Sequence, residues 1–181
     1  MPTLHACPLS RLAETAAATG AGRLVTLVTP GLPPVARPAR IAARHHLVLE
    51  FGDIARARPG HVLASEAHLD AFLAFVRDWD RAAPLVIHCY AGISRSTAAA
   101  YVAACALAPE RCEAEAAAAL RHASPSATPN PHLVALADAR LGRGGRMVAA
   151  IGRLGRGTEA FEGRPFAMPL ATCCRESSPA A

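Results

Sequence analysis

The sequence contains no lysine, few aromatic residues and no long apolar run. All 19 basic residues among the 181 are arginine, and aromatic residues make up only 4% of the chain, although hydrophobic residues make up 52%. We attribute the missing lysine and the excess of alanine to a compositional bias of the genome. The core must therefore be built largely from alanine, leucine and valine, and the length suits one domain with such a core.

Other absences narrow the classes of protein that the chain can belong to. No stretch of 18 apolar residues is present, so we expect no membrane span. Residues 1–20 lack a basic region followed by a long apolar one, so we expect no signal peptide. The cysteines are Cys7, Cys89, Cys105, Cys112, Cys173 and Cys174. Because no Cys or His cluster has zinc spacing and nothing marks secretion, we expect reduced thiols in the cytoplasm, and neither metal nor cofactor.

The order of the expected elements predicts the fold class. We expect strands at 24–29, 47–51 and 85–87, and helices at 10–19, 65–79, 95–107, 109–122, 131–141 and 143–154. The strands are largely apolar, as strands covered on both faces are. This indicates an α/β fold with a mostly parallel central sheet of about four to five strands, flanked by helices on both faces. We expect a single catalytic domain over 1–155 and a flexible tail over 156–181.

The stretch "PLVIHCYAGISRSTAAAY", residues 84–101, carries the chemistry. An apolar strand ends on Cys89, and a helix begins within a few residues. The backbone N–H groups of such a turn, together with the helix N-terminus, form a nest for a tetrahedral oxyanion. Gly92 permits the positive φ that the nest requires, and Arg95 adds a fork for two phosphate oxygens. Cys89, whose thiolate the nest would stabilise, is then placed to attack a bound phosphoryl group.

These residues resemble the His-Cys-(x)5-Arg-Ser/Thr signature of the cysteine-dependent protein tyrosine and dual-specificity phosphatases. The resemblance covers about residues 24–141, includes "TPNPHLVALAD" downstream, and is typical of a compact bacterial member. It implies a phosphatase-like fold, with Cys89 as nucleophile and Arg95 as ligand of the phosphate. It also implies that Ser96 steadies the thiolate and that His88 orders the loop through hydrogen bonds. The expected phosphate-binding positions are Tyr90, Ala91, Gly92, Ile93, Ser94 and Arg95.

Asp53 is the candidate general acid. A leaving group needs a proton, and Asp53 follows the strand at 47–51 in a glycine-containing loop, 36 residues before Cys89. The resemblance implies an acid in that place. The alternative is an aspartate that only forms the turn. Asp70, Asp78 and Asp80 lie on or at the end of the helix at 65–79, where a solvated face is the ordinary explanation.

The loop also bears on the substrate. Between Cys89 and Arg95 it carries no charged residue, whereas lipid-directed members of the family often have lysine there. A phosphotyrosine protein or peptide is therefore the first expectation, and dual specificity, phosphoinositides and small phosphate esters remain alternatives. The sequence does not give the oligomeric state.

Three further hypotheses stay open at this stage. A rhodanese-like sulfurtransferase also holds a cysteine in an anion loop, although its loop is typically shorter than the five residues found here. A catalytically silent phosphoprotein-binding module would keep the pocket without turnover. Finally, the net charge of +5 permits anionic partners, and arginines near one helical face could form a membrane or nucleic-acid surface. Because no aromatic residues alternate with them, we expect a solvated face and no nucleic-acid partner. These arginines are Arg143, Arg146, Arg153 and Arg156.

Overall fold

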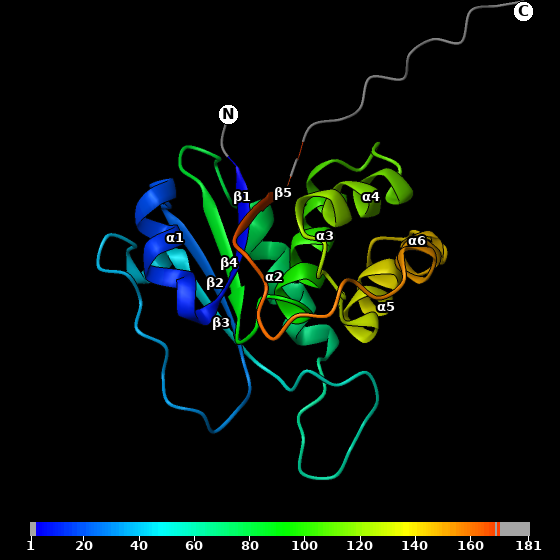
Figure 1. Cartoon of the computed structure of the whole chain (residues 1–181), viewed down its shortest axis with the longest axis horizontal. Coiled ribbons are helices and arrows are strands. Elements are labelled where there is room, and N and C mark those ends of the chain that lie inside the picture. Colours follow the sequence, from blue (N-terminus) through cyan, green and yellow to red (C-terminus); the bar gives the residue numbers. More distant parts are fainter. Residues whose placement is uncertain (1–2, 169, 171–181) are drawn as a thin grey trace, which may run out of the picture.

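The computed structural model describes residues 3–168 and residue 170. Five strands form one central sheet that helices cover on both faces (Figure 1). The strands are β1 (Leu4–Pro8), β2 (Arg23–Val28), β3 (His46–Glu50), β4 (Leu85–Cys89) and β5 (Phe166–Met168). The α-helices are α1 (Leu12–Thr19), α2 (Glu66–Arg77), α3 (Arg95–Leu107), α4 (Glu113–Ala123), α5 (Pro131–Arg140) and α6 (Arg146–Leu154). Two short 3-10 helices, η1 (Leu9–Arg11) and η2 (Ala43–His45), complete the set.

The sheet has the strand order β3-β2-β4-β1-β5. The first four strands are parallel to their neighbours, and only β5 runs antiparallel, beside β1. The predicted class, a mostly parallel sheet of four to five strands between helices, is therefore confirmed. The carboxyl ends of β2, β3 and β4 meet at one edge of the sheet, which is where ligands bind in such folds.

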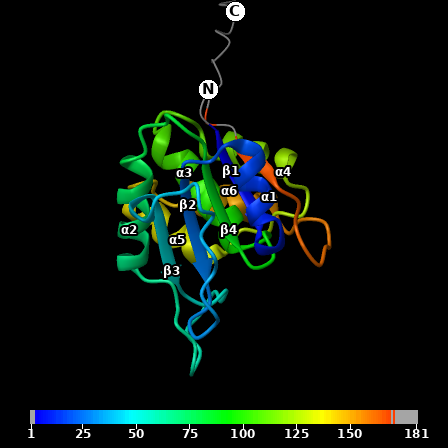
Figure 2. The same ribbon diagram turned by 90° about the vertical axis from the view of Figure 1, so that its left-hand side faces the viewer.

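The two faces of the sheet pack against unequal layers. On one face α1 packs Leu12 and Ala16 against Leu24 and Val86. On the other face α2 to α6 form a thicker layer, as Figures 1 and 2 show from two directions. The middle of that layer is α3, in which every residue from Arg95 to Cys105 is buried. Its alanines explain how a helix can be enclosed on all sides, because their short side chains let the sheet and the other helices approach closely.

Local sequence signals account for several boundaries. Ser65 accepts a hydrogen bond from the backbone of His68 and so caps α2. Asn130 caps α5, and Pro131 takes the first helical position, where a missing N–H costs nothing. Gly20 ends α1 in the left-handed conformation. The helix expected at 95–107 agrees with α3 at both ends, whereas the one expected at 109–122 begins later, at Glu113.

The chain after residue 155 differs from the expected flexible tail. Thr158 N–H donates to the carbonyl of Pro125. Strand β5 pairs antiparallel with β1, with Met168 opposite Leu4. We call residues 157–168 the C-terminal segment. Its glycines are used for close approach: a Cβ at Gly157 would lie 2.4 Å from a backbone atom of Ser126. The rest of the expected tail, apart from residue 170, lies outside the described residues.

The helices of the described part are too short or too polar to cross a membrane.

Candidate active site

The loop that joins β4 to α3 is the centre of the site. We call residues 89–95 the signature loop. The last residue of β4 is Cys89 and the first of α3 is Arg95, so the loop lies at the carboxyl edge of the sheet and at a helix N-terminus. Gly92 has a φ of +69°, as the sequence predicts, and a Cβ on it would lie 2.6 Å from the nitrogen of Pro8. Any other residue would displace the loop from β1.

The sulfur of Cys89 is surrounded by hydrogen-bond donors. The backbone N–H of Gly92 donates to Sγ with an N–S distance of 3.3 Å. The Oγ of Ser96 lies 3.2 Å from the same sulfur. The side chain is buried, with Cys89 only 2% exposed. One backbone N–H and one hydroxyl group therefore lie within hydrogen-bond distance of the sulfur.

The other described buried cysteines have a different environment. Burial raises the pKa of Cys7 to about 11. Burial likewise raises the pKa of Cys105 to about 11. At neutral pH both are therefore protonated thiols and poor nucleophiles. Cys112 is exposed, and Cys173 and Cys174 lie outside the described residues.

The carbonyl groups of the signature loop are held from outside. In a trans peptide the C=O and the following N–H point in opposite directions. A carbonyl fixed on the outer side therefore turns the next N–H toward the inner side, where an anion would be bound. Three neighbouring segments supply these donors, at N–O distances of 2.8 to 3.1 Å. The pairs are Leu9 N–H with Tyr90 O, Gly163 N–H with Ala91 O, and Thr128 N–H with Ile93 O.

Arg95 is buried and only partly committed to protein partners. Its Nη1 donates to the carbonyl of Phe51 at 2.8 Å and to Oγ1 of Thr29 at 3.2 Å. Among the residues that the structure describes, its Nε is buried without a hydrogen-bond partner. The guanidinium is thus anchored to the ends of β2 and β3, and the Nε edge keeps a donor for a ligand.

Asp53 lies against the signature loop, as its position after β3 predicts. Its Oδ1 accepts from Oγ of Ser94 at 2.7 Å and from Nδ2 of Asn130 at 2.8 Å. The oxygen of the Asn130 side chain accepts from the N–H groups of His132 and Leu133. One asparagine therefore joins the Asp53 loop to the start of α5. Among the residues that the structure describes, neither of these side-chain contacts involves the second oxygen of Asp53, Oδ2.

His88 lies beneath the loop and is fully buried. Its Nε2 is 2.8 Å from Oγ1 of Thr26, which is also 2.8 Å from Nε2 of His46. Burial lowers the pKa of His88 to about 4, so the ring is neutral at physiological pH. These contacts join β4 to β2 and β3. His88 therefore supports the strand that ends on Cys89. We expected hydrogen bonds of His88 to order the loop, and the bond found joins it to Thr26 of β2.

Sequence reasoning missed several residues that shape the site. Asn130 lies in the recognised "TPNP" segment, but nothing in the sequence indicated its bond to Asp53. Leu9, Thr29 and Gly163 gave no signal at all, because their contacts join segments far apart in the chain. Of the local geometry, the sequence indicated the positive φ of Gly92 in the nest, but not the contact of this residue with Pro8.

The four arginines of the proposed charged face do not act as one surface. Arg143 is buried and donates to Glu113, at 3.1 Å, and to the carbonyl of Cys105, at 2.6 Å. Arg146 donates to the same carboxylate at 3.0 Å. Two of the four are therefore engaged with Glu113: Arg143 ties the turn before α6 to α3 and α4, and Arg146 ties α6 to α4. Within residues 3–168, no group of three or more His, Cys, Asp or Glu side chains could hold a metal ion.

Comparison with known proteins agrees with the fold. No family model and no curated protein matches the sequence. Solved structures do match: human DUSP28 has a TM-score of 0.59 and 22% identity, over 79% of this chain and 94% of that one. The Cydia pomonella PTP-2 phosphatase has a TM-score of 0.59 and 18% identity, over 76% of this chain and 84% of that one. A mouse protein described as a dual specificity phosphatase, complexed with zinc tungstate, has a TM-score of 0.57 and 18% identity, over 81% and 86%. The chain thus has the fold of the dual specificity phosphatases.

Proposed function

We propose that this protein is a phosphomonoester hydrolase that works through a cysteinyl-phosphate intermediate. The observation that carries the proposal is the environment of Cys89. Its sulfur accepts from Gly92 N–H and faces Ser96, within a loop whose carbonyls are fixed outward. A nucleophile and an anion site are thereby placed together, which is what phosphoryl transfer to sulfur needs.

In the first step the thiolate of Cys89 attacks phosphorus, and the bond from phosphorus to the leaving-group oxygen breaks. The Nε edge of Arg95 and the inward N–H groups stabilise the charge on the equatorial oxygens. Asp53, protonated on Oδ2, gives its proton to the leaving oxygen. Ser94 and Asn130 hold Oδ1 and so fix the direction of that carboxyl group.

In the second step water attacks the phosphorus of the cysteinyl phosphate, and the sulfur–phosphorus bond breaks. Asp53, now ionised, takes a proton from the water and is ready for the next cycle. Ser96 donates to the sulfur as it becomes a thiolate again, at a present separation of 3.2 Å. His88 takes no proton in this scheme, since burial lowers its pKa to about 4 and it stays neutral.

We further propose that the substrate is a phosphorylated protein or peptide, with phosphotyrosine first and dual specificity as the alternative. Support comes from the signature loop, where Arg95 is the one cationic side chain and no lysine attracts a second phosphate. The names of the structural neighbours favour the same class of substrate, although they leave tyrosine and dual specificity open.

The test is hydrolysis of p-nitrophenyl phosphate and of phosphotyrosine, phosphoserine and phosphothreonine peptides. We expect turnover that survives EDTA, is inhibited by vanadate and is lost in Cys89→Ser. A matched control is Cys112→Ser, an exposed cysteine outside the site, which should keep activity. Retained turnover in Cys89→Ser would overturn the mechanism. Vanadate binding without turnover would favour a phosphoprotein-binding module, and thiosulfate-dependent sulfur transfer to cyanide would favour a rhodanese-like enzyme.

A further inference from the structure

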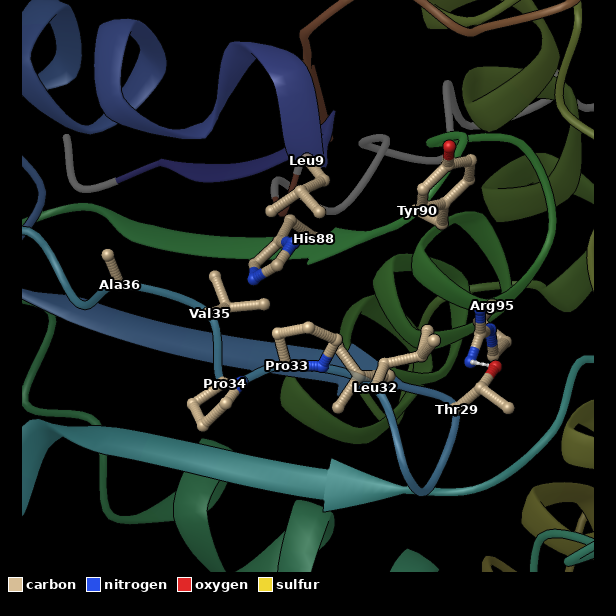
Figure 3. A pocket seen from close by; sticks show the side chains of 11 residues that line it. Leu9, Thr29, Leu32, Pro33, Pro34, Val35, Ala36, His88, Tyr90 and Arg95 are labelled. Atoms are coloured by element: carbon tan, nitrogen blue, oxygen red, sulfur yellow. Dashed lines mark hydrogen bonds between the residues drawn. The ribbon is translucent and has the colours of Figure 1, made fainter.

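A cavity of about 770 Å³ lies beside the signature loop (Figure 3). It is bounded by the end of β2, the residue that opens η1, and residues 30–38, which we call the proline-rich segment. Apolar side chains make up most of its wall, with Leu9, Val28, Leu32, Pro33 and Val35 among them. Figure 3 shows Arg95 and Thr29 at one end of the cavity and Val35 and Ala36 toward the other.

The polar groups of the cavity are few and lie near the signature loop. Arg95 is the one charged residue among those that line it. His88 also lines it, but the low pKa that burial gives this ring keeps it uncharged, and its Nε2 is occupied by Thr26. The hydroxyl of Thr29 accepts from Arg95. The cavity therefore offers a single cation at one end and a mostly apolar wall, in which His88 Nδ1 and the hydroxyl of Tyr90 are further uncharged polar groups.

We propose that this cavity receives the apolar organic group of the phosphate monoester whose phosphate the signature loop binds, and that this group is larger than one aromatic ring. The inference rests on the proposed function and adds the class of substrate. Two residues of the signature loop, Tyr90 and Arg95, also line the cavity. A ligand held by its phosphate at Arg95 can therefore extend along the apolar wall without leaving the protein surface.

Volume and charge decide which group fits. A cavity of about 770 Å³ is in the range that proteins use for whole small-molecule ligands, of roughly 300–1,000 Å³. A phenyl ring alone would leave most of it to water. An inositol ring with further phosphates would place anions against proline, leucine and valine with no second cation to pair them, which is unfavourable. An uncharged aryl or alkyl-aryl group is the chemistry that matches.

The test is a series of 4-alkylphenyl phosphates with alkyl chains from methyl to hexyl. All members have nearly the same phenol as leaving group, so the chemical step stays constant while the apolar length changes. We expect kcat/KM to rise about two- to fourfold per methylene until the cavity is filled, because each buried methylene is stabilising. A flat series, with phenyl phosphate turned over normally, would overturn this inference and leave the proposed phosphatase activity intact.

Variants of the cavity wall show whether the rise in kcat/KM per methylene comes from contacts with that wall. Val35→Ser replaces a half-buried apolar side chain of the wall, and we expect the gain per methylene to shrink. Leu32→Ser is a second variant at a position that is 56% exposed, where folding tolerates polarity. Val148→Ser on α6 is the control, because Val148 is 45% exposed and belongs to a distant helix. An equal loss of gain in Val148→Ser would contradict the assignment to the cavity.

A binding measurement separates this inference from catalysis. The probes are 4-alkylbenzylphosphonates, which carry the same apolar groups and cannot be hydrolysed, and the protein is Cys89→Ser. Affinity that rises with chain length in this variant, and less so with Val35→Ser added, supports the cavity even if no ester is hydrolysed. Affinity independent of chain length would overturn it. Among phosphotyrosine peptides, the proposed substrates, one with leucine beside the phosphotyrosine should be preferred to one with serine there.

Discussion

The two walls of the site differ in how they are held. On one side, the signature loop has its carbonyls tied by Leu9, Thr128 and Gly163, which come from three separate segments. On the other side, the proline-rich segment is almost free of such ties. Within the described residues, no hydrogen bond joins residues 30–36 to another segment, and four prolines among residues 30–38 lack an N–H altogether.

The difference in hydrogen bonding between the two walls corresponds to two tasks, phosphoryl transfer and recognition of an apolar group. Phosphoryl transfer needs donors fixed in advance, because a misplacement of about 1 Å can cost roughly a hundredfold in rate. Recognition of an apolar group needs only a surface of suitable shape, and prolines limit its conformations without hydrogen bonds. Changes that touch the signature loop or its anchors should therefore have large effects on turnover. Changes in the proline-rich segment should have smaller effects that depend on the substrate.

The largest effect short of removing the nucleophile is expected for Arg95→Lys. A lysine keeps the charge, but it can neither reach Phe51 and Thr29 together nor present the planar Nε edge to phosphate. We expect kcat/KM to fall by several orders of magnitude, with the affinity for vanadate falling as well. Steady-state kinetics and vanadate titration measure both. Near wild-type values would mean that Arg95 does not bind the phosphate.

Next in size is Asp53→Asn. If Asp53 protonates the leaving group, kcat should fall roughly 10²–10⁴-fold for phosphotyrosine, and the loss should be smaller for p-nitrophenyl phosphate, whose leaving group is a weaker base. The basic limb of the pH profile should flatten too. A small, uniform loss across leaving groups would instead assign Asp53 to a structural tether of Ser94 and Asn130.

Asn130→Ala separates the position of this carboxyl group from its chemistry. The variant removes the donor to Asp53 Oδ1 and the cap of α5, but keeps the proposed acid. It should lower kcat less than Asp53→Asn does, while the basic limb of the pH profile is retained.

A smaller loss is expected for Gly163→Ala, although residue 163 touches no substrate in the proposed scheme. Its added Cβ would lie 2.7 Å from the carbonyl oxygen of Gly92, so the signature loop or the C-terminal segment must move. We expect kcat to fall roughly 10- to 100-fold. The change should be visible in vanadate affinity as well as in kcat.

The matched control for Gly163→Ala is Gly152→Ala in α6, where nothing lies within 4 Å of the added Cβ. This substitution should leave kinetics unchanged and stabilise the helix slightly. Full activity in Gly163→Ala, at unchanged thermal stability, would show that the outer anchors are dispensable.

The sequence predicted where the signature loop and Asp53 lie in the fold. Cys89, Gly92 and Arg95 form one local unit, strand, turn and helix, so their spacing carries enough information to place them. The position of Asp53 beside this loop followed from two parallel strands ending at the same edge of a sheet. Both inferences depend on short-range rules that a linear sequence retains.

The segments that surround the signature loop could not be predicted in this way. The strand Leu4–Pro8 has a mixed pattern and ends on a proline, and the three residues of β5 are too few to show alternation. Their stability comes from pairing with strands distant in sequence. Gly163 looked like part of a flexible tail, since only the folded chain brings its N–H to Ala91. Glycines and prolines indicated mobility where the structure uses glycine for close approach.

The smallest expected change is in the rate of amide hydrogen exchange when ligands bind to the two walls, the signature loop and the proline-rich segment. The free N–H groups of residues 31–36 should exchange quickly with and without vanadate. Exchange in the signature loop should slow when vanadate accepts from its inward N–H groups. A 4-hexylbenzylphosphonate should slow both segments. Protection of residues 31–36 by vanadate alone would show that the two walls are not independent.

The most direct test of the account is to isolate the phosphorylated enzyme. Ser96→Ala should slow the second step more than the first, since it removes the hydroxyl 3.2 Å from the sulfur that leaves. Rapid quenching during turnover of p-nitrophenyl phosphate, followed by tryptic digestion and mass spectrometry, reports on the peptide of residues 82–95. We expect one added phosphate on Cys89, more abundant in Ser96→Ala than in the wild type. Steady release of phosphate with Cys89 never phosphorylated in either protein would contradict it.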